Sequence, residues 1–206
     1  MIGIIDYGMG NILSVKNAFH YLGEEAIICE DPKELNKVSK IVLPGVGAFP
    51  NCMKSLSENG FIEPLNQMVL VKQKPILGIC LGMQVMASIG YEINQSVGLN
   101  WFKSEVVKIN NGNLPIKIPN IGWEPVYINS NDALFNNFNL NKNPNFYFVH
   151  SYYMNCFDKS NVTSWYQLGD YKITSSIQKD NIFGTQFHPE KSSEIGLDVL
   201  INFLNI

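Results

Sequence analysis

The first half of the chain alternates short, mostly apolar runs with segments whose apolar residues recur every three or four positions. The runs cover residues 2–5, 26–29, 40–43 and 76–79. Runs of this length are typical of buried parallel strands, and the longer spacing is typical of helices that cover them. Helices are expected over 12–22, from Asp31, and over 51–58, 62–71 and 83–89. This order predicts a parallel, doubly wound α/β sheet.

The pattern changes after about residue 95. Short runs, many of them alternating between apolar and polar residues, follow at 102–109, 123–128, 146–149, 164–168, 172–177 and 182–186. Turns such as 110–113 separate them, and an Asn-rich segment at 129–145 is expected to form a loop with a short helix. Alternation predicts antiparallel strands that flank or extend the parallel sheet, giving a mostly parallel mixed sheet. A last helix is expected from Ser192. Without a repeat or a linker, residues 1–206 are expected to form one domain.

Composition narrows the class of protein. The 206 residues are 46% hydrophobic and carry a net charge of -3 without a basic block, which disfavours nucleic acid and anionic membranes as partners. The first residues lack the basic region of a signal peptide, and no apolar run reaches transmembrane length. The four cysteines are far apart and indicate neither a disulfide framework nor a zinc site. A soluble cytoplasmic protein is expected.

Cys80 stands between two glycines where a predicted strand meets a predicted helix, in Gly78-Ile79-Cys80-Leu81-Gly82. This is the pattern of a nucleophile elbow, with sulfur in place of the serine oxygen. The sharp turn needs small neighbours, and a helix that begins beneath the sulfur favours the thiolate. The alternative is a buried structural cysteine, but the strand, the glycines and the helix together favour a nucleophile.

A second glycine pair follows the preceding strand, in Pro44-Gly45-Val46-Gly47. Backbone N–H groups in such a turn can face an anion, although an ordinary tight turn explains the pair equally well by itself. Beside an elbow, the backbone after Gly45 and the N–H of Leu81 are better explained as an oxyanion hole. An earlier pair, Gly8 and Gly10, lacks the remaining residues of a dinucleotide or phosphate loop.

The chain has three histidines that could serve the cysteine as a base. His20 is expected near the end of the first helix, where the helix dipole favours a cation. His150 and His188 each follow a predicted strand, and sites in α/β sheets collect beyond the carboxyl ends of strands. Only His188 has a carboxylate close by, Glu190, across a proline. Cys80, His188 and Glu190 therefore form the expected nucleophile, base and orienting group.

Two motifs, Gly78-Ile79-Cys80-Leu81-Gly82-Met83-Gln84 and Gln186-Phe187-His188-Pro189-Glu190, resemble those of the class I (triad) glutamine amidotransferases. Further blocks narrow the resemblance to the glutaminase subunits of imidazole glycerol phosphate synthases: 6–11, 43–49, 122–123 and 147–153. The matches run from residue 6 to residue 192. The resemblance implies the class I glutamine amidotransferase-like (flavodoxin-like) fold and an enzyme of histidine biosynthesis.

The resemblance also implies individual roles. Cys80 would form a glutamyl thioester with L-glutamine, His188 would move the proton, and Glu190 would orient His188. The oxyanion hole would come from Gly45, Val46, Gly47 and Leu81, and the substrate would be held by Gln84, Ser151 and Tyr152. No metal or cofactor is implied. Ammonia would pass to a (β/α)8-barrel cyclase in a heterodimer, which makes imidazole glycerol phosphate and 5-aminoimidazole-4-carboxamide ribonucleotide.

Three positions depart from the subfamily pattern: Asn120 and Glu124 replace a histidine and an asparagine around Gly122-Trp123, and Leu13 replaces a polar residue. By resemblance they lie in segments that face the partner. They leave open a paralogue that feeds ammonia to a sugar amidotransferase of surface-glycan synthesis. A non-catalytic binding module of the same fold is a further alternative, but its mark would be loss of the triad.

Overall fold

The computed structural model describes residues 1–110, 117–129, 132–139 and 142–206. Its centre is a parallel sheet in the order β2-β1-β3-β4-β13. These strands are β1 (Ile2–Ile5), β2 (Ala26–Cys29), β3 (Lys40–Gly45), β4 (Ile76–Cys80) and β13 (Ile182–Thr185). The four apolar runs of the first half therefore form the strands that the sequence predicts.

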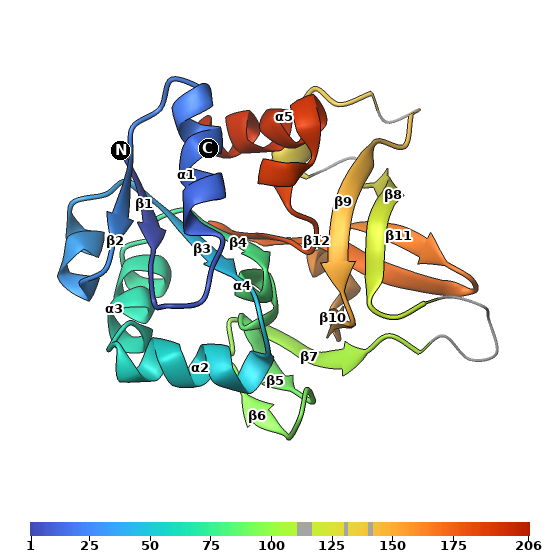
Figure 1. Ribbon diagram of the computed structural model, residues 1–206, viewed down its shortest axis with the longest axis horizontal. Helices are drawn as coiled ribbons and strands as arrows, with labels where there is room; N and C mark the ends of the chain where they lie inside the picture. The colour runs from blue at the N-terminus through green and yellow to red at the C-terminus, as the bar shows by residue number, and fades with distance from the viewer. Residues whose placement is uncertain (111–116, 130–131, 140–141) are drawn as a thin grey trace.

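Helices cover both faces of the parallel sheet (Figure 1). On one face lie α1 (Ile12–Tyr21) and α5 (Ser193–Leu204), and on the other lie α2 (Phe49–Glu58) and α3 (Ile62–Asn66), which continues as a π-helical turn over Gln67–Val71. A 3-10 turn, Pro32–Asn36, begins at the Asp31 cap, as expected. The side-chain alternation of a strand divides the core, since Ile4 packs with the first pair of helices and Ile5 with the second.

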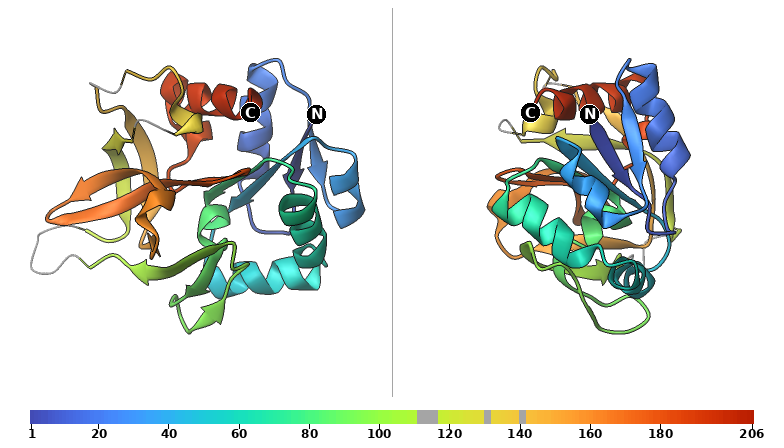
Figure 2. Two further views of the ribbon diagram at one scale, coloured as in Figure 1. Left: turned by 180° about the vertical axis from the view of Figure 1, so that it is seen from behind. Right: turned by 90° about the vertical axis from the view of Figure 1, so that its left-hand side faces the viewer.

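Antiparallel strands extend the sheet to nine strands, in the order β13-β12-β11-β8-β9. They are β8 (Asn120–Ile128), β9 (Asn145–His150), β11 (Val162–Leu168) and β12 (Tyr171–Lys179). In Figure 2 these yellow and orange strands project to one side of the blue parallel strands. The sheet is thus mixed, but its parallel and antiparallel parts are of similar size, because four strands follow β13 on this side.

A second, four-stranded sheet has the order β10-β7-β5-β6. It contains β5 (Ala87–Gly90), β6 (Ser96–Val97), β7 (Phe102–Lys108) and β10 (Tyr152–Cys156). Of these, only β7 is predicted by the sequence pattern. The remaining short turns are 3-10 segments at Ala133–Phe135, Lys159–Asn161 and Pro189–Lys191.

The prediction of a helix over residues 83–89 is wrong. The structure has a single turn, α4 (Leu81–Gln84), and the chain then enters β5 at Ala87. The carbonyls of Val85 and Met86 accept hydrogen bonds from the N–H groups of Leu99 and Phe102, at 2.8 and 3.1 Å. These long-range bonds replace those that a helix would make, so the dipole behind Cys80 is that of one turn only.

Two expected loops fall partly outside the described residues. The turn at 110–113 is described only at its first residue, and the Asn-rich loop lacks residues 130–131 and 140–141. The described part of that loop contains the expected short helix, Ala133–Phe135. Among the helices in the described ranges, none has the length and apolar character needed to span a bilayer.

Candidate active site

The strand-to-helix turn at Cys80 is strained in the way that an elbow requires. Cys80 has φ +55° and ψ -110°, a conformation that residues with a side chain rarely adopt. Its glycine neighbours leave room for the turn. A Cβ on Gly82 would overlap the carbonyl oxygen of Leu43, and one on Gly78 would lie 2.7 Å from the backbone nitrogen of Met83. The packing of β3 and α4 against β4 therefore holds the sulfur at the sheet edge.

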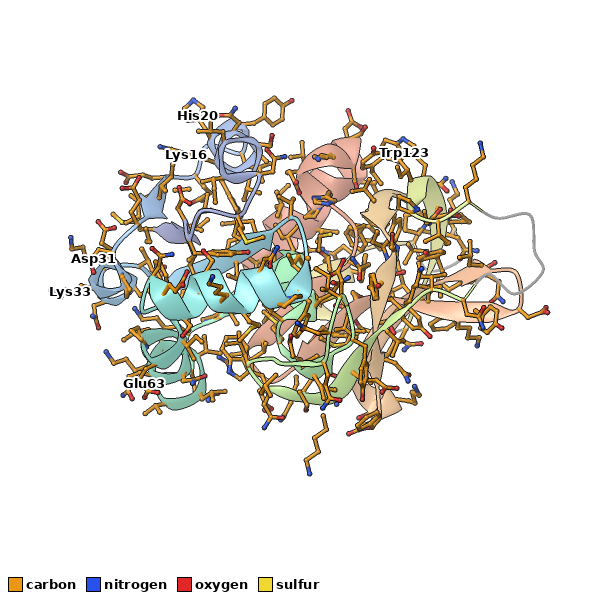
Figure 3. The ribbon with its side chains drawn as sticks, turned by 60° about the horizontal axis from the view of Figure 1, so that its bottom comes forward. Lys16, His20, Asp31, Lys33, Glu63 and Trp123 are labelled. Atoms are coloured by element: carbon orange, nitrogen blue, oxygen red, sulfur yellow. The ribbon has the colours of Figure 1, made fainter. Side chains whose placement is uncertain are left out.

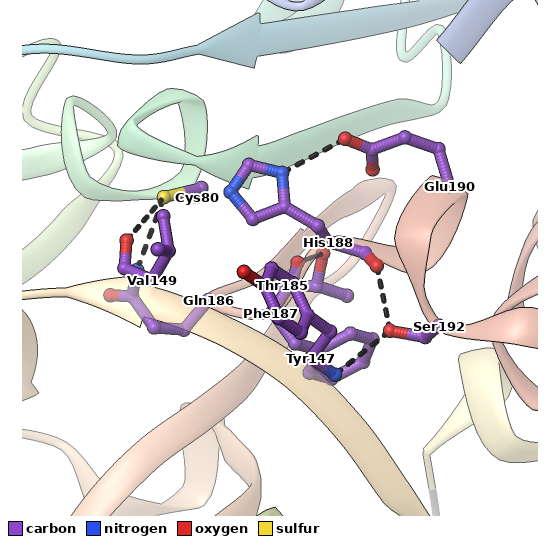
Figure 4. Close-up of polar contacts among 9 residues, drawn as sticks. All are labelled: Cys80, Tyr147, Val149, Thr185, Gln186, Phe187, His188, Glu190 and Ser192. Carbon is purple, nitrogen blue, oxygen red and sulfur yellow. Dashed lines mark hydrogen bonds and ion pairs between the residues drawn. The ribbon is translucent and has the colours of Figure 1, made fainter. Parts of the chain in front are cut away.

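The imidazole of His188 lies beyond the end of β13, between Cys80 and Glu190 (Figure 4). Its Nδ1 is 2.9 Å from Oε1 of Glu190, and both side chains are buried. Ser192 fixes the backbone here, since its hydroxyl donates to the carbonyl of His188 at 2.7 Å and accepts from the N–H of Tyr147 at 3.0 Å. The carboxylate thus selects the Nδ1–H tautomer and aims Nε2 away from itself.

The charges around His188 favour its imidazolium form. Burial lowers the pKa of His188, but the neighbouring Cys80 and Glu190 outweigh it and raise that pKa to about 10. Nε2 is buried, and within the described part of the chain no atom forms a hydrogen bond with it. Figure 4 shows this nitrogen turned toward the sulfur of Cys80. The pair is arranged to hold a proton between sulfur and nitrogen.

A cavity of about 100 Å³ opens onto Cys80 and His188. Its wall includes six of the residues for which the sequence predicts oxyanion or substrate contacts: Val46, Gly47, Leu81, Gln84, Ser151 and Tyr152. Gly47 has φ +105°, so the loop after β3 depends on a glycine there. Gly45 does not line the cavity. It lies beneath the loop, where a Cβ would come within 2.8 Å of Gly82 N and the Tyr7 hydroxyl.

Gln84 already uses both hydrogens of its side-chain amide. Nε2 donates to the carbonyl of Tyr152 at 2.8 Å and to Oε1 of Gln186 at 2.9 Å. An amide nitrogen has two hydrogens, so only Oε1 of Gln84 is left to contact a ligand in the cavity.

The other two histidines occupy different environments. His150 lines the cavity, but its Nδ1 lies 2.8 Å from the carbonyl of Tyr152 and its Nε2 lies 3.0 Å from the hydroxyl of Tyr166. Burial lowers the pKa of His150 to about 4, so the ring is neutral at pH 7. His20 is exposed near the end of α1 and away from the cavity (Figure 3).

The sequence pattern does not single out two polar residues of the site. Glu92 is the one carboxylate among the described residues that line the cavity, and it accepts from the N–H of Phe49 at 2.8 Å. No local signal marks it. Gln186 lies under the sulfur, with Nε2 3.6 Å from Sγ of Cys80. It follows the last residue of β13 and precedes His188 by two residues, so its nearness to the predicted base is the signal that the sequence offers.

The residues that depart from the subfamily pattern differ in how exposed they are. Asn120 is buried and donates to the hydroxyl of Tyr166 at 3.1 Å, so its own side chain is not presented at the surface of this chain. The alternation of β8 turns Asn120 inward and Ile121 and Trp123 outward, and Figure 3 shows Trp123 at the surface. Leu13, at the start of α1, is also exposed.

Comparisons with known proteins agree with this geometry. The family model described as "Glutamine amidotransferase class-I" matches residues 3–206. Imidazole glycerol phosphate synthase subunit HisH 1 of Campylobacter jejuni is 48% identical over the whole of both chains. The HisH subunit of Leptospira interrogans is 43% identical, also over the whole of both chains.

Solved structures with lower sequence identity share the fold. The structure of PurLQS from Thermotoga maritima has a TM-score of 0.78 at 19% identity and covers 99% of this chain and 97% of its own. The glutaminase domain of CTPS from Trypanosoma brucei, solved with bound acivicin, has a TM-score of 0.63 at 16% identity and covers 99% and 93%. The chain belongs to the class I glutamine amidotransferase family.

Proposed function

We propose that this protein is the glutaminase subunit of an imidazole glycerol phosphate synthase, and that it hydrolyses L-glutamine to glutamate and ammonia. Full-length similarity to subunits of that name supports the assignment. The observation that carries the chemistry is the row of Cys80, His188 and Glu190, in which Cys80 and His188 line one cavity and Glu190 lies behind His188.

In the first half of the reaction, Cys80 is the nucleophile. Its thiolate attacks the amide carbon of glutamine while His188 holds the proton. The carbonyl oxygen becomes an oxyanion, which is stabilised by backbone N–H groups at Val46, Gly47 and Leu81. The intermediate then collapses, the C–N bond breaks, and His188 gives its proton to the leaving ammonia. A glutamyl thioester on Cys80 remains.

In the second half, water attacks the thioester. His188 takes a proton from the water and keeps it, the C–S bond breaks, and sulfur leaves as thiolate, so glutamate is released and the thiolate–imidazolium pair is restored. Glu190 supports the positive charge of His188 in both halves through its bond to Nδ1.

The cavity also supports a mode of substrate recognition. The α-ammonium of glutamine is a cation, and Glu92 with the free Oε1 of Gln84 offers acceptors for it. Ser151 and Tyr152 lie on the same wall and can contact the α-carboxylate. The amide end of the substrate is then directed toward Cys80.

Ammonia is lost if it reaches solvent, so the glutaminase needs a synthase beside it. We assign that role to a (β/α)8-barrel cyclase, bound as a heterodimer in the cytoplasm to this single-domain chain. The exposed Ile121 and Trp123 on β8, together with Leu13, offer apolar area for such a contact. Ammonia would then enter the barrel and complete imidazole glycerol phosphate and 5-aminoimidazole-4-carboxamide ribonucleotide.

The assignment is tested by mixing the purified chain with the barrel cyclase of the same genome. Glutamate release should be slow for the free chain and should rise about a hundredfold or more when cyclase and its nucleotide substrate are added, as expected if one oxyanion donor is brought into place. Growth of a histidine auxotroph that carries both genes is the second measurement. Glutaminase activity without any response to the cyclase would contradict the pathway.

Glu124 keeps the sugar-amidotransferase pathway as a second candidate. It places a half-buried carboxylate next in sequence to the exposed Trp123 and on the other side of β8, where the subfamily has a neutral amide, and this changes the charge that a partner at β8 must match. Recovery of a sugar amidotransferase in a pull-down, with no growth of the auxotroph, would favour this candidate over the histidine pathway.

A further inference from the structure

A row of side-chain amides connects the wall of the cavity to the nucleophile. It begins at the backbone carbonyl of Tyr152, continues through Gln84 and Gln186, and ends at Sγ of Cys80. Gln186 is fully buried, and the parallel register of β13 with β4, which pairs Thr185 with Ile79, brings it beside Cys80. Gln186 is not an expected member of the triad, yet it contacts the reacting atom.

The direction of these hydrogen bonds is fixed at one end. The carbonyl of Tyr152 can only accept, so the group that Gln84 turns toward it must be the NH₂. The second hydrogen of that NH₂ then requires an acceptor, which is Oε1 of Gln186, at 2.9 Å. Because the Gln186 oxygen is occupied in this way, its own NH₂ must face the sulfur, at 3.6 Å. The two amides therefore cannot be flipped independently.

We propose that Gln186 is a further catalytic residue: its side-chain NH₂ donates a hydrogen bond to the Cys80 sulfur and stabilises the thiolate, and Gln84 holds Gln186 in that orientation. The inference rests on the proposed function, in which Cys80 is the nucleophile. A donor to sulfur favours the charged form that attacks glutamine, and it does so again when the thioester breaks and sulfur leaves as thiolate.

This role differs from that of the other groups around the sulfur. His188 exchanges a proton with Cys80, and the carbonyl of Val149, 4.0 Å from Sγ, can only accept from a thiol. Among the described residues that contact Sγ, Gln186 is the one that offers a neutral donor. Its contribution should therefore be felt even when no substrate is bound.

Alkylation of Cys80 by iodoacetamide across pH measures this contribution without glutamine or partner. The other cysteines are buried, and burial raises the pKa of Cys29 to about 11 and those of Cys52 and Cys156 to about 12, so they react slowly. Gln186→Met keeps the volume and removes the donor. We expect the midpoint of its curve of alkylation rate against pH to move up by about one pH unit. At pH values below that midpoint, the reaction should be about tenfold slower than in wild type.

A matched control is Gln167→Met, the same change at an exposed position of β11. It should follow the wild-type profile. Gln84→Met keeps Gln186 but removes the hydrogen bond that orients its amide, so it should shift the profile in the same direction. This variant also tests the proposal if Gln186→Met does not fold. Variants that are folded by circular dichroism and that alkylate like wild type would overturn the proposal.

The same measurement separates this proposal from the proposed function. If the profile shifts but no partner elicits glutamine hydrolysis, Gln186 is a donor to the sulfur and the glutaminase assignment fails. If glutamine is hydrolysed through Cys80 and the profile does not shift, the assignment stands and the role of Gln186 fails.

Discussion

The hydroxyl of Tyr7 donates a hydrogen bond to the carbonyl of Pro44 at 2.9 Å, at the base of the loop that lines the cavity. Burial raises the pKa of Tyr7 well above its usual value, so the hydroxyl remains a donor. Ser55 and Asn59 of α2 and the following turn donate in turn to the carbonyl of Tyr7. The turn after β1 therefore ties the loop over Cys80 to the body of the protein.

Tyr7→Phe should weaken the fold, because it leaves the buried carbonyl of Pro44 without its donor. We expect the free energy of unfolding in urea to fall by about 1–3 kcal/mol. Tyr21→Phe, the same change on an exposed side chain, should stay within about 0.5 kcal/mol of wild type. Equal stability of the two variants would show that the Tyr7–Pro44 bond does not hold the loop.

Cys80→Ala should abolish glutamine hydrolysis while the fold persists, because the neighbour of Ser151 on the same wall, His150, has both ring nitrogens paired and cannot serve as its base. Glutamate release, measured with the partner present, should fall to background. Cys29→Ala, at a buried cysteine in β2, should keep activity in the fraction that folds. Substantial hydrolysis by folded Cys80→Ala would remove the basis of the assignment.

The backbone conformation at position 80 should lower the stability of the fold whenever the residue there carries a Cβ. With φ +55° and ψ -110°, a glycine there relieves strain of about 1 kcal/mol or more. Cys80→Gly should therefore be more stable than Cys80→Ala in urea unfolding, although glycine normally destabilises a folded chain. The reverse order would mean that the elbow is unstrained.

His188 and Glu190 should differ in how much activity they carry. His188→Ala removes the proton carrier and should approach the loss in Cys80→Ala. Glu190→Gln keeps the geometry but weakens support for the imidazolium, so a residual rate should remain. Because such residues act as a unit, the double variant should be scarcely slower than His188→Ala. Multiplied losses in kcat would instead indicate separate steps.

The same pair should make stability depend on pH. The pKa of His188 is raised to about 10 in the folded chain and is about 6.5 when unfolded. The folded state thus binds a proton more tightly, and the stabilisation is complete below pH 6.5 and is lost as pH rises toward 10. The advantage of wild type over Glu190→Gln in urea should shrink between pH 6.5 and 9. Glu194→Gln, on an exposed carboxylate, should show no such trend.

The sequence predicts elements well where the pattern that marks them is local. Wholly apolar runs such as 2–5 and 76–79 match their strands, because any sheet would bury them. The prediction for the segment after Gln84 is wrong, because its backbone carbonyls accept hydrogen bonds from N–H groups near residue 100. Such long-range bonds leave no local pattern in the sequence. Strands β5, β6 and β10 are short and depend on the same pairings.

The site follows a similar rule. Cys80 and the pair His188 and Glu190 stand out because their chemistry needs close neighbours in sequence, glycines in one case and a carboxylate in the other. Glu92 contacts the start of α2 from 43 residues away, and Gln186 reaches Cys80 across 106 residues. Only the folded chain brings Glu92 to the cavity wall and Gln186 to the sulfur of Cys80.

The buried hydrogen-bond network around His150 has a consequence for proton transfer through the protein. From β8, Asn120 donates to Tyr166, and His150 then contacts both Tyr166 and the carbonyl of Tyr152. That carbonyl also accepts from Gln84, so it receives hydrogens from both sides and has none to pass on. A proton therefore cannot pass from β8 to Cys80 along this route. A displacement of Asn120, by contrast, can be passed along it from residue to residue. The network can therefore transmit a change of position from β8 to the cavity wall, but it carries no proton to Cys80.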